Sequence, residues 1–253
     1  MAWGGAVGRD RAAETALAPL RTAGVDLRDV CRFDTGHTRR ALVKVDADTG
    51  GREIFPDRDS RVAVAAGNLA FGRIEAARVL LVDAEDPEAT LAAARHARSA
   101  GVLTVLDADA PVPKLERILE VIDFPIVSRA LAEVLGNGSA EEGLRVLAQG
   151  STRLAVVTLG AEGCLAVAPG EGPVIASPAF EVQVRDTTGA GDAFHAGFIS
   201  ALLEGRRPLA ALRIANAVAA LNCTALGAQA GLPTREKLAN LLAAREHSDR
   251  GDK

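Results

Sequence analysis

The sequence is poor in aromatic and in sulfur-containing residues. It has seven phenylalanines, one tryptophan, no tyrosine and one methionine, and aromatic residues make up 3% of the chain. Its core must therefore be aliphatic, and it lacks the series of rings on which single-stranded nucleic acid stacks. The three cysteines, Cys31, Cys164 and Cys223, are odd in number and have no metal-site spacing. This pattern predicts reduced, mostly buried thiols in a cytoplasmic protein.

Excess positive charge and long apolar runs are lacking too. The formal net charge of -4 at pH 7 argues against binding to the phosphate backbone of a nucleic acid. No apolar segment reaches the roughly 20 residues needed to cross a membrane, and no signal peptide begins the chain. With 253 residues, 48% of them hydrophobic, the chain is long enough for one large domain. The composition predicts a cytoplasmic enzyme with neither nucleic acid nor membrane among its partners.

Predicted strands and helices alternate along the chain. Apolar runs predict strands over residues 79–82, 102–106, 122–127, 154–159, 164–168 and 180–184. Other segments predict helices over residues 11–23, 88–100, 208–225 and 234–245, with a further apolar helix beginning at Ala193. Such alternation predicts an α/β fold with a mostly parallel, doubly wound sheet and helices on both faces. The continuous apolar run at residues 79–82 is typical of a strand buried on both faces.

One predicted hairpin departs from this alternation. Residues 41–45 and 52–55 read as strands on either side of a turn at residues 46–51, within a hairpin spanning residues 38–55. No internal repeat or low-complexity linker divides the chain. We therefore predict a single domain over residues 1–246 and a disordered polar tail over residues 247–253.

The segment Asp-Thr-Thr-Gly-Ala-Gly-Asp at residues 186–192 is the most specific local pattern. It follows the strand-like segment and precedes the apolar helix. The glycines Gly189 and Gly191 let the backbone turn sharply and approach a ligand. The helix that follows directs free N–H groups and the positive end of its dipole at the same point. The segment therefore predicts an anion site, the alternative being a glycine-rich turn that only begins a helix.

A phosphate at this site would have the carboxylate of Asp192 beside it. The amides of Gly189, Ala190 and Gly191 would then stabilise the charge of a migrating phosphoryl group, while Asp192 accepts the proton of the attacking hydroxyl. This combination of residues predicts phosphoryl transfer.

The pattern D-T-T-G-A-G-D-A-F resembles the signature of the PfkB carbohydrate kinases, also called the ribokinase-like family. Residues 157–163 resemble the family's nucleotide-side turn, and residues 215–217 and 227–233 resemble its adenine-side helix and loop. The resemblance extends from about Gly5 to the last helix. It implies a ribokinase-like three-layer sandwich in which residues 38–55 form part of a β lid over the sugar.

The resemblance also implies an activity and its cofactors. The activity is ATP-dependent phosphorylation of a sugar or sugar-like alcohol, with Mg²⁺ held largely by water and ATP and with no protein residue assigned as a metal ligand. A monovalent cation and a homodimer formed through the lid are further expectations. The residues that it implies for nucleotide binding are Thr158, Gly160, Gly163, Thr188 and Asn216.

Several of these residues have a second interpretation. Thr158 and its two glycines could form an ordinary turn between strands, and Asn216 could be a buried amide bonded to backbone. His195, one turn into the helix, is predicted to be a packed or surface side chain. Asp107 and Asp109 follow a predicted strand, where α/β sheets place ligands, but they could instead cap a helix, as could residues 85–86.

Some stretches resemble one branch of the family. Residues 100–107, 189–195 and 222–224 are similar to sulfofructose kinase, and residues 126–128 and 139–142 are similar to ketohexokinase. In the sulfofructose kinases an arginine that faces the sulfonate follows the strand at residues 79–83. Here that place holds Ala-Glu-Asp at residues 84–86, so we predict that the substrate is a neutral polyol or ketose rather than sulfofructose.

Two departures from the family leave alternatives open. The chain begins late, without the family's first strand, its sugar-binding aspartate and half of the lid, so it is predicted to be an N-terminally truncated chain with exposed sheet edges. The family's Asn-x-x-Glu pattern, linked to magnesium, falls on Ser128 and Leu131. The alternatives are a catalytically impaired nucleotide-binding paralogue or fragment, and a kinase that acts on a nucleoside.

Overall fold

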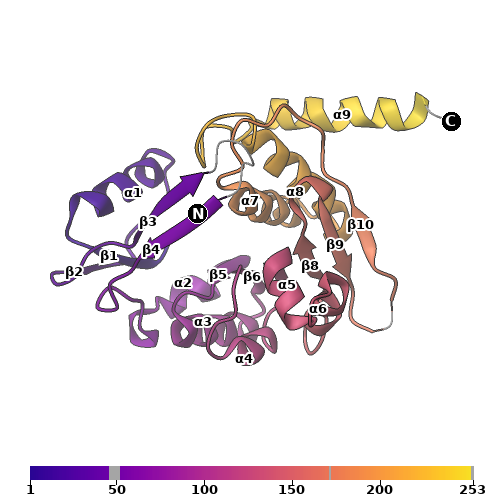
Figure 1. Cartoon of the computed structure of the whole chain (residues 1–253). Helices are drawn as coiled ribbons and strands as arrows, with labels where there is room; N and C mark the ends of the chain where they lie inside the picture. The colour runs from indigo at the N-terminus through magenta and orange to yellow at the C-terminus, as the bar shows by residue number, and fades with distance from the viewer. Residues whose placement is uncertain (46–51, 171, 252–253) are drawn as a thin grey trace.

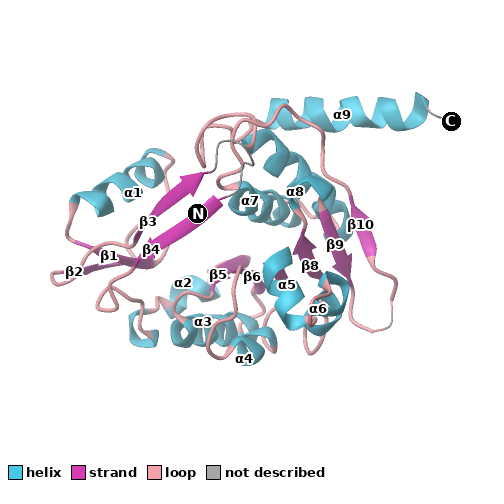
Figure 2. Cartoon of the chain, viewed as in Figure 1, coloured by secondary structure: helices cyan, strands magenta, loops and turns pink. Residues whose placement is uncertain are grey.

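A six-stranded sheet forms the centre of the computed structural model, which describes residues 1–45, 52–170 and 172–251 (Figures 1 and 2). The strand order is β10-β9-β8-β7-β6-β5. The strands are β5 (Val79–Asp83), β6 (Leu103–Ala108), β7 (Phe124–Ser128), β8 (Ala155–Thr158), β9 (Cys164–Val167) and β10 (Ile175–Ser177). The first four are parallel to one another, and β9 and β10 are antiparallel to their neighbours. The predicted mostly parallel sheet is confirmed.

Helices cover both faces of this sheet. One face carries α3 (Pro87–Ser99), α4 (Leu115–Leu119), α5 (Arg129–Leu135) and α6 (Ala140–Leu147), and the other carries α7 (Ala190–Leu203) and α8 (Pro208–Asn222). Successive strand residues point to opposite faces, so Val105 packs with the α7–α8 layer and Leu106 with the α3–α6 layer. Both layers are aliphatic, with Phe124 and Phe198 in edge contact inside the α7–α8 layer. The fold is the predicted three-layer sandwich.

A smaller unit precedes the sheet. The strands β1 (Gly5–Gly8) and β2 (Val30–Phe33) pair in parallel and are joined by α1 (Arg11–Thr22), which buries Ala13 and Leu17 against Val7. The strands β3 (Arg40–Val45) and β4 (Arg52–Asp57) pair antiparallel as the predicted hairpin, which we call the lid. The predicted turn at residues 46–51 lies outside the described residues. The short helices η1 (Ala66–Asn68) and α2 (Phe71–Glu75) then connect the lid to β5.

Strand β5 differs from its prediction. Among the described residues it pairs with β6 alone, and the side chain of Leu81 is 44% exposed. An apolar run resembles a strand buried on both faces, but it does not reveal whether the chain supplies a neighbour on each side. The structure therefore makes β5 an edge strand rather than a fully covered one.

Two other segments differ from their predictions. Residues 180–184 are extended but belong to no strand, because β10 already pairs with the outer edge of β9. They run instead along α8, where the Arg185 N–H donates to the Cys223 carbonyl at 2.8 Å. The last helix, α9 (Arg235–Gly251), continues through most of the tail that was predicted to be disordered, because each added residue of an existing helix gains a backbone hydrogen bond.

Each helix in the described part of the chain is too short or too polar to span a lipid bilayer.

Candidate active site

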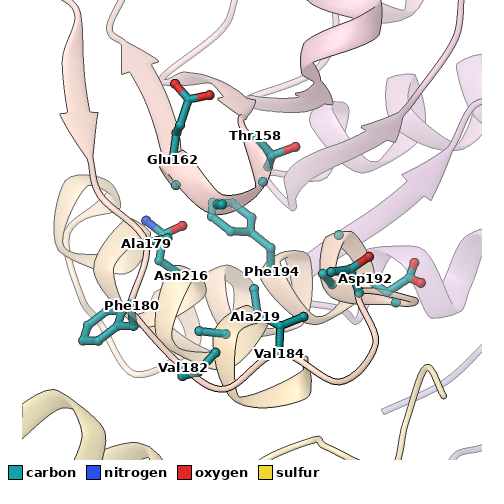
Figure 3. Close-up of a pocket in the computed structure, with 18 of the residues that line it drawn as sticks. Thr158, Glu162, Ala179, Phe180, Val182, Val184, Asp192, Phe194, Asn216 and Ala219 are labelled. Carbon is teal, nitrogen blue, oxygen red and sulfur yellow. The ribbon is translucent and has the colours of Figure 1, made fainter. Parts of the chain in front are cut away.

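An open cleft lies between the carboxyl ends of the central strands and the first turn of α7 (Figure 3). Its volume is about 1740 Å³, above the roughly 300–1,000 Å³ of a pocket for one small ligand, so it has room for two substrates. All nine residues predicted to act in catalysis or nucleotide binding line it: Thr158, Gly160, Gly163, Thr188, Gly189, Ala190, Gly191, Asp192 and Asn216. The fold thus brings together segments that are up to 58 positions apart in the chain.

The glycines of the anion site have different roles. Gly189 is in the left-handed region, with φ of 74°, and a Cβ there would lie 2.7 Å from the carbonyl oxygen of Ala228. Gly191 lies inside the first helical turn, and a Cβ there would meet open space. The sequence attributed the sharp turn to both residues, but the structure assigns it to Gly189 alone. The missing side chain of Gly191 leaves room for a ligand beside the helix.

The backbone donors of the loop are not equivalent either. The Ala190 N–H donates to the carbonyl of Thr187 at 3.2 Å. Among the described residues, no backbone acceptor contacts the N–H groups of Gly189 or Gly191. These two amides are therefore available to an anion, as expected for the unpaired donors of a helix N-terminus.

Asp186 anchors the loop at residues 186–192 through hydrogen bonds. One of its carboxylate oxygens accepts from the N–H and the hydroxyl of Thr188, at 2.9 and 2.7 Å, and the other accepts from the Gly227 N–H at 2.8 Å. Asn222 donates to the Thr188 carbonyl at 3.2 Å. The Thr188 hydroxyl thus braces the loop through a carboxylate. Sequence reasoning assigned no role to Asp186, although an aspartate two residues before a threonine is a common turn signal.

Three carboxylates line the cleft. Asp192 lies in the first turn of α7, Asp107 lies near the end of β6, and Asp109 directly follows that strand. Burial raises the pKa of the Asp107 carboxyl to about 6; His195 opposes the shift, while Asp109, Asp192 and Asp83 add to it. The helix-capping alternative for Asp107 and Asp109 is wrong, because α4 begins only at Leu115 and both residues line the cleft.

His195 is buried, with 3% of its surface exposed, as the packed interpretation predicted. Its Nδ1 lies 2.8 Å from the Gly191 carbonyl oxygen and 3.6 Å from a carboxylate oxygen of Asp107. Its Nε2 lies 3.3 Å from the carbonyl oxygen of Ile126, in β7. The ring therefore joins α7 to two strands of the sheet.

The second half of the cleft is formed by the turn between β8 and β9 together with α8. Thr158 ends β8, η2 (Gly160–Glu162) follows, and Gly163 has φ of 92°. A Cβ on Gly163 would lie 2.2 Å from the Ser177 carbonyl oxygen, so this position requires glycine. Buried Asn216 donates from Nδ2 to the same carbonyl at 2.9 Å and to the Ser177 hydroxyl at 3.0 Å. Asn216 is thus a buried amide bonded to backbone, and it also lines the cleft, while its role in nucleotide binding stays a prediction.

An apolar wall of this half was missed by sequence reasoning. It includes Phe180, Val182, Val184 and Ala219, which Figure 3 shows on the side of the cleft opposite Thr158. Phe180 also lies under the guanidinium groups of Arg213 and Arg245, at 5.6 and 4.9 Å. The signal was present, because the alternation of residues 180, 182 and 184 places three apolar side chains on one side. It was interpreted as a strand, although the segment lines a pocket.

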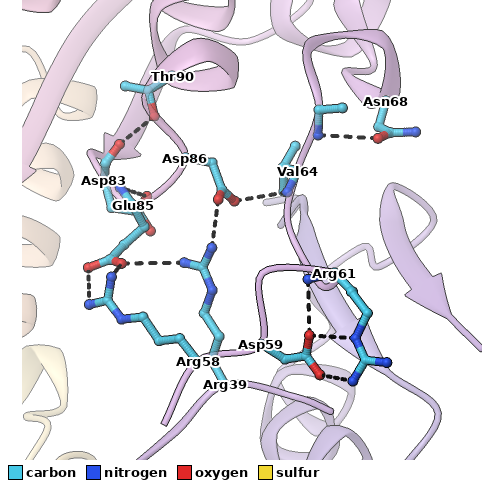
Figure 4. A network of polar contacts seen from close by, with 11 residues as sticks. Arg39, Arg58, Asp59, Arg61, Val64, Asn68, Asp83, Glu85, Asp86 and Thr90 are labelled. Carbon is cyan, nitrogen blue, oxygen red and sulfur yellow. Dashed lines mark hydrogen bonds and ion pairs between the residues drawn. The ribbon is translucent and has the colours of Figure 1, made fainter. Parts of the chain in front are cut away.

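Four side chains hold the lid against the main sheet (Figure 4). Arg39 pairs with Asp86 at 2.6 Å and with Glu85 at 3.4 Å, and Arg58 donates to Glu85 at 2.8 Å. We call Arg39, Arg58, Glu85 and Asp86 the clasp. The capping interpretation is wrong for Asp86, whose second oxygen accepts from the Val64 N–H at 2.9 Å rather than from α3. The carboxylates that were expected to repel a sulfonate are therefore already paired with arginines.

The metal-linked positions have structural roles here. The Ser128 hydroxyl accepts from the Leu131 N–H at 3.3 Å and caps α5, while the Leu131 side chain is fully buried. Within the described residues, no group of three histidine, cysteine, aspartate or glutamate side chains has metal-binding geometry. The expectation that Mg²⁺ is held largely by water and ATP stays a prediction.

The comparisons with known proteins agree on one family. The profile of the pfkB family carbohydrate kinases matches residues 1–235. Ribokinase of Haemophilus influenzae is 28% identical over 245 residues, which cover 93% of this chain and 79% of the relative. The ATP-dependent ribose-1-phosphate kinase of Halopiger xanaduensis is 31% identical over 244 residues, which cover 95% of this chain and 80% of the relative.

A solved structure agrees with these sequence relatives. Thermotoga maritima ribokinase superposes with a TM-score of 0.80 and 26% identity, over 94% of this chain and 79% of the other. The predicted family and fold are confirmed, whereas the sulfofructose kinase and ketohexokinase branch stays a prediction. The anion loop, the facing nucleotide-side turn and the family match lead to one conclusion: the chain belongs to the pfkB family of carbohydrate kinases and is an ATP-using phosphotransferase.

Proposed function

We propose that this protein transfers the γ-phosphate of ATP to a hydroxyl group of a sugar or sugar-like alcohol, with Asp192 as the general base. One observation carries the proposal. The unpaired amides of Gly189 and Gly191 and the carboxylate of Asp192 share one cleft with the Thr158 turn and Asn216. An anion site alone does not need a carboxylate beside it, whereas phosphoryl transfer to a hydroxyl needs a base that takes the hydroxyl proton.

The cleft divides naturally between two substrates. The adenine and ribose would lie between the turn at residues 158–163 and the apolar wall, where Asn216 supplies a polar contact. The triphosphate would extend toward the first turn of α7. The acceptor would lie beyond it, beside Asp107 and Asp109, where Val43 and Ile54 of the lid line the cleft.

In this arrangement the residues have separate tasks. Asp192 accepts the proton as the acceptor oxygen attacks the γ-phosphorus in line with the leaving group. The Gly189 and Gly191 amides stabilise the negative charge of the transferring group, and the Ala190 amide joins them only if its bond to Thr187 opens. Mg²⁺ would supply charge neutralisation at the phosphates, held there largely by water. The monovalent cation and the lid-mediated homodimer stay predictions of the family resemblance.

The test is a comparison of the parent with Asp192→Asn on a panel of ribose, fructose, ribose 1-phosphate, sugar acids and nucleosides. Phosphorus NMR identifies the product, and coupled ADP release gives the rate. We expect a loss of roughly 100-fold or more in turnover with little change in nucleotide affinity, because the base is removed but the shape is kept. Glu204→Gln, at the exposed far end of α7, is the matched control. Turnover within a few-fold of the parent would exclude Asp192 as the base.

A further inference from the structure

His195 is surrounded by hydrogen-bond acceptors. Its Nδ1 faces the Gly191 carbonyl oxygen and the Asp107 carboxylate, and its Nε2 faces the Ile126 carbonyl oxygen. A neutral imidazole donates from only one nitrogen, whereas the imidazolium donates from both. Because the ring is 3% exposed, water cannot easily supply the missing partner. Acceptors on both sides of the ring receive a hydrogen bond only when both ring nitrogens carry a proton.

The charges around Asp107 make this proton important. Asp109 on the same strand end, Asp192 on α7 and Asp83 on β5 all place negative charge near the Asp107 carboxyl. Among the described groups that act on it, His195 alone contributes the opposite charge. An uncompensated Asp107 would therefore add negative charge to a site that must admit a polyphosphate.

We propose that His195 is a positioning residue of the phosphoryl-transfer site, whose protonated ring pairs with Asp107 to form a net-neutral unit behind Asp192. The pair leaves Asp192 as the carboxylate directed at the acceptor and lets the triphosphate approach the Gly189 and Gly191 amides. Because both ring nitrogens donate to backbone, the same ring fixes the first turn of α7 to β7. The inference rests on the proposed function and adds a pair of residues that supports Asp192 from behind at the same site.

The charge argument gives a specific pH signature. In the parent, the protonated His195 ring offsets the charge that Asp107 gains when it ionises. In His195→Gln the opposing charge is lost. Burial has already raised the pKa of Asp107 to about 6, and without His195 it should be higher still. As the pH rises through this range, an unpaired negative charge appears beside the phosphates and weakens nucleotide binding.

The experiment measures binding of Mg²⁺ and a non-hydrolysable ATP analogue by calorimetry from pH 5.5 to 8.5. For His195→Gln we expect a loss of affinity of roughly tenfold or more at pH 8.5, the size expected for one like charge a few ångström away, and a fall in affinity that is centred at a higher pH than in the parent. Adding Asp107→Asn to this variant should restore most of the affinity at pH 8.5. His96→Gln, which removes a partly exposed histidine 2.8 Å from Glu75, is the matched control and should follow the parent.

Two results would overturn the proposal. One is a loss of affinity in His195→Gln that Asp107→Asn does not restore, since that is the behaviour of a packing defect. The other is an unchanged affinity at every pH. If His195→Gln fails to fold, the fallback is to measure the nitrogen-15 chemical shifts of the four histidine rings in the unliganded parent. These shifts show whether each ring is neutral or protonated, and a neutral His195 ring at pH 7 would contradict the pairing. A parent that binds the analogue but phosphorylates no acceptor contradicts the proposed function, not the pair.

Discussion

The phosphate end of the cleft and its lid end are held in place by different interactions. At the phosphate end, α7 and α8 pack on the six-stranded sheet through fully buried side chains that include Phe198, Leu212 and Ile126. At the lid end, the β1–α1–β2 unit has a small cluster of its own, and the clasp joins the lid to the main sheet by ion pairs. Apolar burial is worth about 25 cal/mol per Å², whereas exposed ion pairs contribute about 0–1 kcal/mol each. Under the proposed function, the protein would therefore combine a rigid site for the phosphate with a weakly attached cover for the acceptor.

The pKa values of carboxylates at the two ends are shifted in opposite directions. Near the lid, the pKa of Asp10 is lowered to about 2 by the hydroxyl and N–H of Thr38 and the N–H of Ala13, and the Arg61 side chain lowers the pKa of Asp59. In the cleft, burial raises the pKa of Asp83 and that of Asp107, the latter to about 6. Hydrogen bonds favour the charged form at one end, and desolvation disfavours it at the other. This contrast, like the packing contrast, can be tested.

The largest effect is expected from Gly189→Val at the phosphate end. Valine strongly disfavours φ of 74°, and its Cβ would meet the Ala228 backbone. We expect a cost of about 1–3 kcal/mol in unfolding free energy from strain alone, together with near-complete loss of turnover. Thermal unfolding and coupled ADP release measure the two effects. Gly191→Ala is the control for stability, because its backbone is helical and its Cβ would meet open space; an equal loss of stability in both variants would contradict the distinction between the two glycines.

Acid should loosen the lid end before the main sheet. Because the pKa of Asp10 in the folded protein is lowered from 3.8 to about 2, its contribution to stability is present above pH 4 and is lost as the pH falls from 4 toward 2. Asp107 has a raised pKa, so its ionisation destabilises the folded state above pH 6, and acid removes that penalty. Hydrogen exchange, corrected for its intrinsic pH dependence, should rise first in residues 1–45. Earlier exchange in β6 and β7 would contradict the expectation that acid loosens the lid end first.

Breaking the clasp should affect the acceptor more than the nucleotide. For Arg39→Gln we expect a destabilisation of less than about 1 kcal/mol, because its ion pairs are partly exposed, and a several-fold rise in the KM of the acceptor as the lid becomes less well held. The KM of ATP should stay within twofold of the parent value. Arg61→Gln, which removes an arginine paired with Asp59 in its own loop, is the matched control. A larger effect on the KM of ATP than on that of the acceptor would show that the clasp does not act through the lid.

The smallest effect is expected from Leu81→Lys on the edge strand. Leu81 is 44% exposed on β5, which among the described residues pairs only with β6. Charge on an edge strand opposes pairing with another chain, so we expect weaker self-association and little change in melting temperature. Light scattering over a concentration series measures this. Unchanged association would show that β5 is not the associating surface, and the exposed Leu42 and Ile54 of the lid would be the next candidates.

Much of the molecule was predictable from local patterns. The positions of β6, β7, β8, α3 and α8 agree with their predictions to within a few residues, because each is a run of one periodicity bounded by turn residues. All nine predicted catalytic and nucleotide-binding residues line one cleft, and five of them belong to the pattern at residues 186–192, which carries its own geometry. The roles of Glu85 and Asp86 were not predictable, since their arginine partners lie 27 to 47 positions away and the hairpin had to be docked first.

The sequence by itself determined the α/β class, the anion loop before α7 and the aliphatic character of the core, because these depend on residues close together in the chain. Tertiary structure decided which glycine must adopt a left-handed conformation, that residues 180–184 form a wall of the cleft rather than a strand, and that β5 lies at an edge. It also decided that a buried histidine on α7 would meet a carboxylate from β6. Periodicity shows which side of an element is apolar, but only the packed fold establishes what lies against it.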